Sequence, residues 1–342
     1  MSDLPAAVPG ARTEARAGAI DAALAAIPHL QRPLTIFVAG ATGFVGRELV
    51  VRLVRAGHQL RIVTRRAKHA DELLPLASVE VGAGNVYDID FLRTCLTGCD
   101  VAINLVGALH APGHGGKGLR RVHVEFTAAL LTAMAEAGVA RLLQMSALNA
   151  SPQAASHYLR TKGEAEELLR AAPARLQWTI FRPSVIFGDG DSLTTRFASL
   201  LRRTRGWLPI ARAGARFAPI HVADVASALL RALRGGATNR QTYELCGPEV
   251  MTLEEIVRGS AAAAGRSCHV LPLPDALGWL QGAVLQCLPG KPFTLDNFRS
   301  LGVDSVCATC GCELLGIQPA SLRALAPLWL SAARAQALEP IR

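Results

Sequence analysis

The stretch LTIFVAGATGFVGRELV, residues 34–50, decides the fold of this chain. It starts with an apolar, β-branched run, passes through three glycines at three-residue spacing, and continues into an amphipathic pattern of helical period. This order predicts a buried strand, a tight turn and a helix. The glycines would let the backbone approach a pyrophosphate, which then lies on the helix N-terminus, where unpaired N–H groups favour an anion.

The spacing of these glycines is G-x-x-G-x-x-G, which differs from the commonest dinucleotide fingerprint, G-x-G-x-x-G. Glycines in such a row could also serve only the close packing of the helix on the strand. Because strand and helix fall where a phosphate-binding turn needs them, we favour dinucleotide binding. The predicted contacts of the turn are Gly40, Thr42, Gly43, Phe44, Val45 and Gly46.

The end of the second predicted strand, Leu60–Thr64, indicates which dinucleotide is bound. An NAD-specific site would place Asp or Glu there to hold the ribose 2′-hydroxyl. This chain instead has Arg65 and Arg66, with Arg47 at the start of the first helix. Those cations suit a 2′-phosphate, so we predict that NADP(H) is favoured over NAD(H). The alternative is that the arginines merely follow a strand in an Arg-rich protein.

One of three tyrosines and one of only four lysines form a pair four residues apart, Tyr158 and Lys162. On a helix both side chains lie on one face, and the ammonium would lower the phenol pKa from about 10 toward a value useful for proton transfer. Ser146 ends the apolar run Ala140–Met145, which is typical of a buried strand. We predict Tyr158 as the acid/base, Lys162 as its tuner and the ribose anchor, and Ser146 as a donor to a substrate carbonyl.

A structural interpretation of the same residues stays open. The segment Tyr158–Arg170 could be an ordinary solvent-facing helix, in which Lys162 and Glu166 form an i,i+4 ion pair.

The order of glycine turn, serine and Tyr-x-x-x-Lys resembles the short-chain dehydrogenase/reductase superfamily, in its extended or atypical branch. Further stretches are similar: Gly84-Asn85-Val86 by the adenine, Asn104–Gly107 after the fourth strand, Phe181–Gly188 over the nicotinamide, and His221–Ala226 at a helix start. The resemblance implies cofactor contacts at Asn85, Val86, Asn104, Val106, Gly107, Lys162, Arg182, Pro183 and Val185. Alternatively, Pro183 only ends a strand and Asp224 only caps a helix Val225–Leu233.

Within that superfamily the chain is similar to the dehydrogenase-like accessory subunit of respiratory complex I and its bacterial relatives. The stretches that carry this resemblance are Arg160–Glu166, Leu288–Phe298 and Val303–Cys307. Two positions depart from the family pattern: Asn85 replaces the usual Asp, and Phe126 stands where many extended members have Gly. Both would alter how the adenine and ribose pack.

Strand and helix patterns alternate from Leu34 to Phe187, and the part after Gly188 is less regular and richer in Pro. We predict an α/β, doubly wound parallel-sheet Rossmann fold with a smaller, less regular C-terminal substrate lobe. The predicted divisions are a flexible extension, 1–32, with a short helix at Ala17–Ala26; the NAD(P)-binding domain, 33–188; a substrate-binding lobe, 189–330, partly interleaved with it; and a tail, 331–342.

Eight cysteines occur without a predicted export signal, which indicates reduced thiols and a cytoplasmic setting. Cys307, Cys310 and Cys312 cluster in sequence, but no fourth Cys or His lies near them, so we predict no metal site.

A net charge of +9 favours anionic partners, and an aromatic content of 5% disfavours stacking on nucleic acid, so no specific nucleic-acid binding is expected. The segment Leu271–Leu288 has apolar residues at helical spacing around Trp279. A core-facing helix is the favoured interpretation, and a helix lying on an anionic membrane or lining a lipid-like pocket is the alternative.

Three functions remain open. The first is an NADP(H)-dependent oxidoreductase acting on a small-molecule carbonyl, alcohol or quinone-like lipophilic substrate. The second, implied by the resemblance, is a non-catalytic cofactor-binding accessory or assembly protein of a respiratory complex, placed peripherally at the inner face of the membrane. The third is an NAD-dependent nucleotide-sugar epimerase or dehydratase, for which no distinct diphosphate-binding segment follows Gly188.

Overall fold

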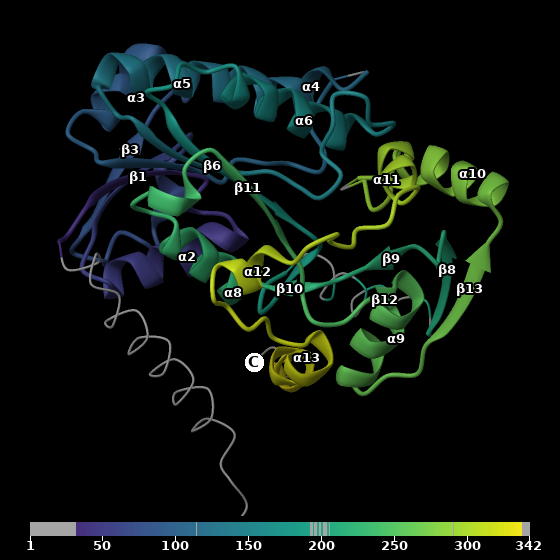
Figure 1. Cartoon of the computed structure of the whole chain (residues 1–342). Helices are drawn as coiled ribbons and strands as arrows, with labels where there is room; N and C mark the ends of the chain where they lie inside the picture. The colour runs from purple at the N-terminus through teal and green to yellow at the C-terminus, as the bar shows by residue number, and fades with distance from the viewer. Residues whose placement is uncertain are drawn as a thin grey trace, which may run out of the picture.

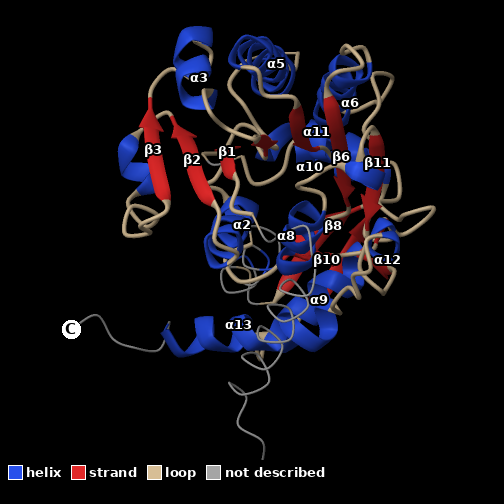
Figure 2. Ribbon diagram, turned by 60° about the vertical axis from the view of Figure 1, so that its left-hand side comes forward, coloured by secondary structure: helices blue, strands red, loops and turns tan. Residues whose placement is uncertain are grey.

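A seven-stranded parallel sheet forms the centre of the molecule, in the order β11-β6-β5-β4-β1-β2-β3 (Figures 1 and 2). The computed structural model describes residues 32–336, except 114, 192–193, 195–196, 198–199, 201–203, 205 and 290. The strands are β1 (Thr35–Ala39), β2 (Gln59–Thr64), β3 (Val79–Ala83), β4 (Val101–Asn104), β5 (Arg141–Met145), β6 (Gln177–Pro183) and β11 (Gln241–Leu245). Every residue of β4 and β5 is buried, as expected for parallel strands covered on both faces.

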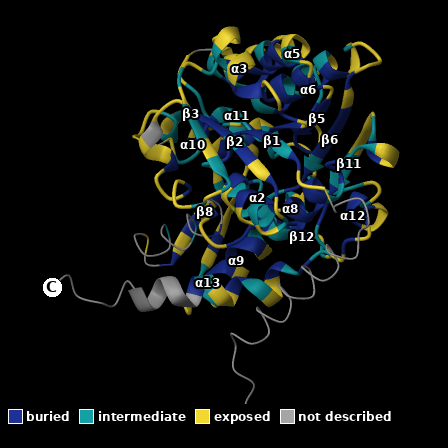
Figure 3. Cartoon of the chain, turned by 90° about the vertical axis from the view of Figure 1, so that its left-hand side faces the viewer, coloured by how far each residue is buried: buried dark blue, intermediate teal, exposed yellow. Residues whose placement is uncertain are grey.

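Helices cover both faces of this sheet, which confirms the predicted doubly wound α/β fold. On one face lie α3 (Ile89–Leu96), α5 (Phe126–Ala137) and α6 (His157–Arg170) (Figure 1). On the other lie α2 (Phe44–Arg55) and α8 (Val222–Arg231), joined by α12 (Gly311–Leu314). Two apolar cores result, one on each side of the sheet, and the outer helix faces carry the exposed residues (Figure 3).

The second lobe is built from short strand pairs and helices beyond β6. Its strands pair as β7 (Ile186–Phe187) with β10 (Ile220–His221), β8 (Trp207–Ala211) with β13 (His269–Leu273), and β9 (Arg216–Phe217) with β12 (Met251–Thr252). Its helices are α9 (Leu253–Ala263), α10 (Asp275–Leu285), α11 (Leu295–Ser300) and α13 (Leu322–Gln336). Between these elements the chain returns to the large sheet as β11, so the two parts are interleaved.

Two sequence-based expectations about helices are wrong. Helix α8 begins at Val222 and its N-cap is His221, so Asp224 does not cap it; the Asp224 carboxylate accepts a hydrogen bond from the Ala320 backbone N–H at 2.7 Å. Helix α10 is not core-facing, because only Gly278 and Gly282 are buried on it. The predicted helix Ala17–Ala26 lies outside the described residues.

The expectation of uniformly reduced thiols is also wrong. Cys246, directly after β11, and Cys307, in the segment between α11 and α12, form a disulfide across a Cα–Cα distance of 6.0 Å. Their sequence separation of 61 hides this pair, which only the fold brings together.

Candidate functional site

The glycine turn follows β1 at the carboxyl edge of the sheet. Gly40 has φ +85°, and a Cβ there would lie 2.9 Å from the carbonyl carbon of Leu105. At Gly46 a Cβ would lie 2.3 Å from the carbonyl oxygen of Gly40, so α2 packs on the turn closer than any side chain permits. Helix α2 has Gly43 as its N-cap, no side-chain acceptor there and no acidic residue in its first turn. Its N-terminus is therefore suited to an anion.

This turn lies at the point where the strand order reverses. The neighbours β1 and β4 are followed in sequence by strands on opposite sides, β2 and β5. In open α/β sheets, ligands bind outside the carboxyl ends of the strands at such a point. The turn residues Gly40–Gly46 and the segment Asn104–Gly107 after β4 both lie there.

Lys162 is brought to the same edge from α6. Its buried ammonium donates hydrogen bonds to the carbonyl oxygen of Val106, at 3.2 Å, and to that of Met145, at 3.0 Å. A Cβ at Gly107 would lie 3.1 Å from Nζ, so a glycine there makes room for the ammonium. Burial lowers the pKa of Lys162 to about 8, and the charge of Glu166 partly opposes this shift. In the described residues Glu166 forms its ion pairs with Arg170 and Arg182, and not with Lys162 as the purely structural interpretation would require.

Tyr158 lies one turn before Lys162, at the start of α6, as predicted. Burial raises its pKa to about 12, the opposite direction from the one we predicted. The reason is that the ammonium of Lys162 is turned to two carbonyl oxygens, and removal of the phenol from water outweighs any help to the phenolate. Tyr158 therefore holds its proton at neutral pH.

The hydroxyl of Ser146 is engaged by another residue of α6. Its buried hydroxyl donates to Oε1 of Glu166 at 2.5 Å. The hydroxyl proton is therefore used within the protein, whereas we predicted that it is donated to a substrate carbonyl. The geometry instead gives Ser146 a role in holding α6 against β5.

The carboxylate of Glu166 is fully buried and accepts hydrogen bonds from two arginines as well as from Ser146. Arg182 of β6 donates to both its oxygens, at 2.9 and 2.6 Å, and Arg170 donates to Oε2 at 2.7 Å. A buried charge needs such partners to offset its desolvation. The guanidinium of Arg182 is thus held against α6.

His123 is a site residue that the sequence prediction missed. It lies on a single π-helical turn, Arg121–Glu125, and its ring contacts that of Tyr158 edge-on with centroids 5.7 Å apart. Its Nε2 accepts from the Ala108 N–H at 3.2 Å, so Nδ1 carries the proton and donates to Oγ1 of Thr161 at 2.8 Å. Burial, aided by Lys162, lowers its pKa to about 2, so the ring is neutral. The π-helical turn, which runs directly into α5, places His123 beside Tyr158, and residue spacing in the sequence does not reveal such a turn.

The other predicted cofactor contacts divide into two groups. Asn104 is buried and engaged by protein, donating to Gln144 at 2.9 Å and to Thr127 at 3.3 Å while it accepts from the Val106 N–H at 3.0 Å. It shapes the turn after β4. Arg65 and Arg66 are exposed directly after β2. Asn85 follows β3, where its side chain accepts from the Tyr87 N–H, and Val86 packs against the apolar core.

The second lobe reaches the catalytic helix through Asp296 of α11. Its two carboxylate oxygens accept the backbone N–H groups of His157, at 2.6 Å, and of Tyr158, at 3.0 Å. Ser156 supplies the ordinary N-cap by accepting from the Leu159 N–H at 3.2 Å. Together they leave few free N–H groups at the end of α6 that carries Tyr158.

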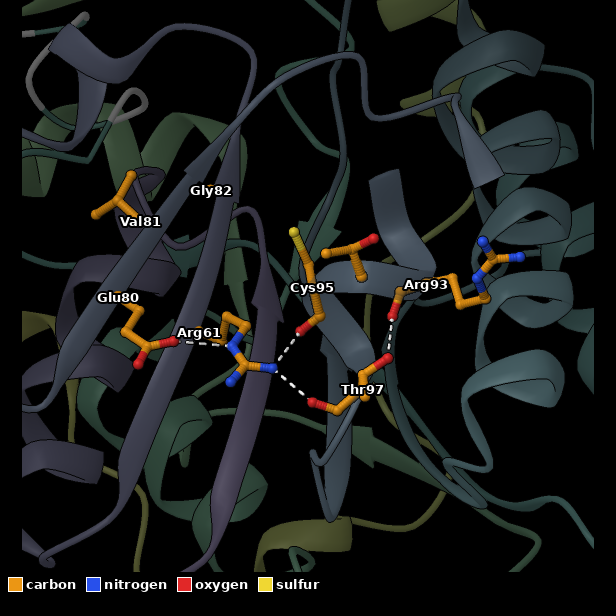
Figure 4. A pocket seen from close by; sticks show the side chains of 8 residues that line it. Arg61, Glu80, Val81, Gly82, Arg93, Cys95 and Thr97 are labelled. Carbon is orange, nitrogen blue, oxygen red and sulfur yellow. Dashed lines mark hydrogen bonds and ion pairs between the residues drawn. The ribbon is translucent and has the colours of Figure 1, made fainter. Parts of the chain in front are cut away.

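Three hollows elsewhere on the surface do not include Tyr158 or Lys162. One of about 530 Å³ is lined by Arg61 and Glu80 of the amino-terminal halves of β2 and β3 and by the end of α3. In Figure 4 the Arg61 guanidinium is seen to bind Glu80 through Nε and the carbonyl oxygens of Cys95 and Thr97 through Nη1. A hollow of about 700 Å³ between α5 and the end of α6 is mainly apolar, and one of about 270 Å³ lies near Asp100 and Arg234.

The fold, the glycine turn and the Tyr158–Lys162 pair define a dinucleotide-binding protein of the short-chain dehydrogenase/reductase type. Residues 40–235 match the family described as NAD(P)H-binding, and the chain belongs to that family.

Two relatives and one solved structure illustrate its range. The chain is 33% identical to subunit 9 of the mitochondrial NADH dehydrogenase (ubiquinone) 1 alpha subcomplex of Arabidopsis thaliana, over 80% of this chain and 68% of that protein. It is 32% identical to a ceramide reductase of Caulobacter vibrioides, over 70% of this chain and 74% of the reductase. The NADPH-dependent quinone oxidoreductase of Escherichia coli, solved with NADPH, has the same fold, with a TM-score of 0.69 and 17% identity over 89% of this chain and all of that chain.

Proposed function

We propose that this protein is an NADP(H)-dependent reductase of a lipophilic carbonyl or quinone-like compound. The observation that carries the proposal is the placement of Tyr158 and Lys162, one helical turn apart, at the carboxyl edge of the sheet beside the glycine turn. A reduced nicotinamide, when bound there, supplies a hydride. The relatives include a reductase of ceramide, which supports a lipophilic substrate.

The protonation states favour reduction over oxidation. With a pKa of about 12, Tyr158 keeps its proton at neutral pH and can donate it to the oxygen of a carbonyl that receives a hydride. The ammonium of Lys162, one turn along the same face, is hydrogen-bonded to the carbonyl oxygens of Val106 and Met145, and we assign it the role of ribose anchor. His123 is neutral and packs against the Tyr158 ring, so it orients the phenol without competing for the proton.

Replacement of the phenol tests this role. Tyr158→Phe removes one oxygen and little volume, so we expect NADPH affinity to stay within about twofold while turnover falls by about 10²–10⁴, the usual range for loss of a general acid. Tyr243→Phe, on the edge strand β11, is the matched control and should keep full turnover. Substrates to compare are a ceramide-type ketone, a short-chain ubiquinone and a water-soluble ketone. Undiminished turnover of Tyr158→Phe would overturn the assignment.

The preference for NADPH rests on the cations after β2. Arg65 and Arg66 are exposed, no acidic residue follows the strand directly, and Arg47 is already paired with Glu72 at 3.0 Å. Each charge-assisted contact to a 2′-phosphate contributes about 1.5–3 kcal/mol. Calorimetric titration should show tighter NADPH than NADH binding, with the difference reduced in Arg65→Ala and kept in Arg55→Ala, at the far end of α2. Equal binding of both cofactors contradicts this preference.

A second candidate function, peripheral attachment to an anionic membrane surface, is favoured by α10. Its outward side chains Leu277, Trp279, Leu280 and Val284 are about half exposed or more, and its glycines form the inner face. Clustered exposed apolar side chains commonly mark an interaction surface. Lys291 and Arg299, on the adjoining segment, are exposed cations. We propose that this face lies on an anionic bilayer, since apolar area combined with nearby basic residues suits that surface. None of the described helices is long and apolar enough to cross a bilayer.

Flotation with phosphatidylglycerol-containing vesicles tests whether α10 binds an anionic bilayer. The wild-type chain should float at low salt and shift its Trp279 fluorescence. A variant with Leu277→Ser and Leu280→Ser should stay unbound, and Leu314→Ser, an exposed leucine on α12, should float like wild type. Equal flotation of all three proteins, or none, argues against docking by α10.

A further inference from the structure

Four cysteines that are scattered in the sequence gather beside the edge strand β11. Cys246 ends that strand, and its carbonyl oxygen accepts from the thiols of Cys310, at 3.4 Å, and Cys312, at 3.8 Å. Cys307 is bonded to Cys246 and donates its backbone N–H to the Cys246 sulfur at 3.0 Å. The fourth cysteine that the sequence prediction did not find is therefore Cys246. Among the described residues, no group of three or more His, Cys, Asp or Glu side chains is arranged to hold a metal ion.

Cys307 has two candidate partners in this cluster. One is Cys246, to which it is bonded. The other is Cys310, three residues on, which completes a C-x-x-C sequence, the spacing of reactive dithiols. The intervening Ala308 and Thr309 are exposed, so the turn between these two cysteines is reachable from solvent.

We propose that Cys246, Cys307 and Cys310 form a thiol–disulfide exchange site in which Cys307 changes partner between Cys246 and Cys310. The Cys310 thiolate attacks the sulfur of Cys307, the bond from that sulfur to Cys246 breaks, and Cys246 leaves as a thiolate that takes up the proton lost by Cys310. One disulfide is present before and after, so the step needs neither oxidant nor reductant.

Cys312 is not a partner in this exchange. It is fully buried, and burial together with Cys310 raises its pKa far above the ordinary value for a thiol. A thiol that stays protonated is a poor nucleophile. Cys310 is only partly buried, and its sulfur already lies at the backbone of Cys246.

The two linkages differ in what they connect. The Cys246–Cys307 bond ties the end of β11 to the segment after α11, in which Ser305 accepts from Ser184 at 2.7 Å and Asp304 accepts from Asn149 at 2.8 Å. A Cys307–Cys310 bond would close only a local turn. Since a cross-link constrains the chain more when it closes a longer loop, exchange should loosen this segment and, through it, Asp296 at the end of α6.

Disulfide mapping tests the proposal without relying on any enzymatic activity. The oxidised full-length chain is held at pH 8, quenched in acid, alkylated with N-ethylmaleimide under denaturing conditions and digested. In wild type we expect two species, one alkylated at Cys310 and one alkylated at Cys246. Cys310→Ser should reduce alkylation of Cys246 at least tenfold, while Cys287→Ser, an exposed thiol elsewhere, should leave both species unchanged.

Three results would overturn the exchange site. The first is Cys246 fully protected in wild type at every time point; the second is the same alkylation of Cys246 in Cys310→Ser. The third is stoichiometric zinc in the purified chain that Cys246→Ser removes, because the four sulfurs would then be metal ligands. Cys246→Ser, which leaves only the Cys307–Cys310 linkage, should also lower the melting temperature of the oxidised chain more than Cys287→Ser does.

Discussion

The glycine turn and the Asp296 segment both shape the active edge, but they do so in different ways. In the turn, the contact of Gly46 with the Gly40 carbonyl joins backbone atoms six residues apart, and the contact of Gly40 with Leu105 joins the turn to the end of the neighbouring strand β4. Asp296 reaches the N–H groups of His157 and Tyr158 across 139 and 138 residues of sequence. The spacing of the glycines along the sequence predicts the turn, whereas the Asp296 contact forms only when the second lobe folds back onto α6.

This difference teaches which parts of the site tolerate change. A Cβ at Gly46 would clash with backbone atoms, and these cannot shift without distorting the turn, so no other residue can replace this glycine. A clamp made by one carboxylate on two N–H groups can weaken gradually, since water replaces part of its hydrogen bonding. The three predictions that follow test this contrast, from the largest expected effect to the smallest.

Substitution of two helical glycines should give opposite results. Gly46→Val places side-chain atoms on the carbonyl oxygens of Gly40 and Ala41, so we expect a loss of stability of about 3 kcal/mol or more, measured by urea unfolding. Gly259→Ala in α9 meets no atom within 4 Å and should raise stability by up to about 1 kcal/mol. Similar effects at both positions would contradict the close approach of α2 to the turn.

The buried ammonium of Lys162 should make stability rise with pH. Its pKa is about 8 in the folded chain and near 10.5 when unperturbed, so between these values the unfolded state holds more protons. Unfolding free energy should therefore increase by up to about 2 kcal/mol from pH 7.5 to 9.5 relative to Lys162→Met, which has no titrating group. Parallel pH curves for the two proteins would show that this lysine is not desolvated.

Removal of the Asp296 clamp should have the smallest effect of the three. Asp296→Ala leaves two N–H groups of α6 without their partner, which should cost about 0.5–2 kcal/mol and lower turnover about two- to thirtyfold, with NADPH affinity unchanged. Asp275→Ala, an exposed carboxylate paired with Arg212 in the same lobe, is the control. Rescue of turnover by Asp296→Asn, whose amide oxygen can still accept one N–H, would separate positioning from charge. An equal loss of NADPH affinity would contradict a role confined to Tyr158.

The sequence predicts what its periodicity and spacing encode. The doubly wound sheet, the turn Gly40–Gly46 and the pairing of Tyr158 with Lys162 all follow from short-range patterns, and the structure places them at one edge of the sheet. Predictions failed where the contact of a side chain depends on a residue far away in the sequence. Ser146 turns to Glu166, Cys246 bonds Cys307, and α10 buries its glycines and exposes its leucines.

The predicted direction of the Tyr158 pKa shift was wrong for a related reason. The spacing of Tyr158 and Lys162 fixes which face they share, but not where the ammonium points or how much water reaches the phenol. Both depend on the carbonyl ends of β4 and β5 and on His123, which come from three other segments.

The late position of Asp296 sets an order of events during synthesis of the chain. The last strand of the large sheet is complete once Leu245 has left the ribosome, whereas Asp296 follows about fifty residues later, a delay of several seconds at ordinary translation rates. During that interval the nascent protein has its glycine turn, but the start of α6 has only its Ser156 cap and lacks the Asp296 carboxylate. Cofactor could therefore engage a growing chain whose tyrosine is not yet fixed, and the bound nucleotide would help the sheet survive until the second lobe arrives.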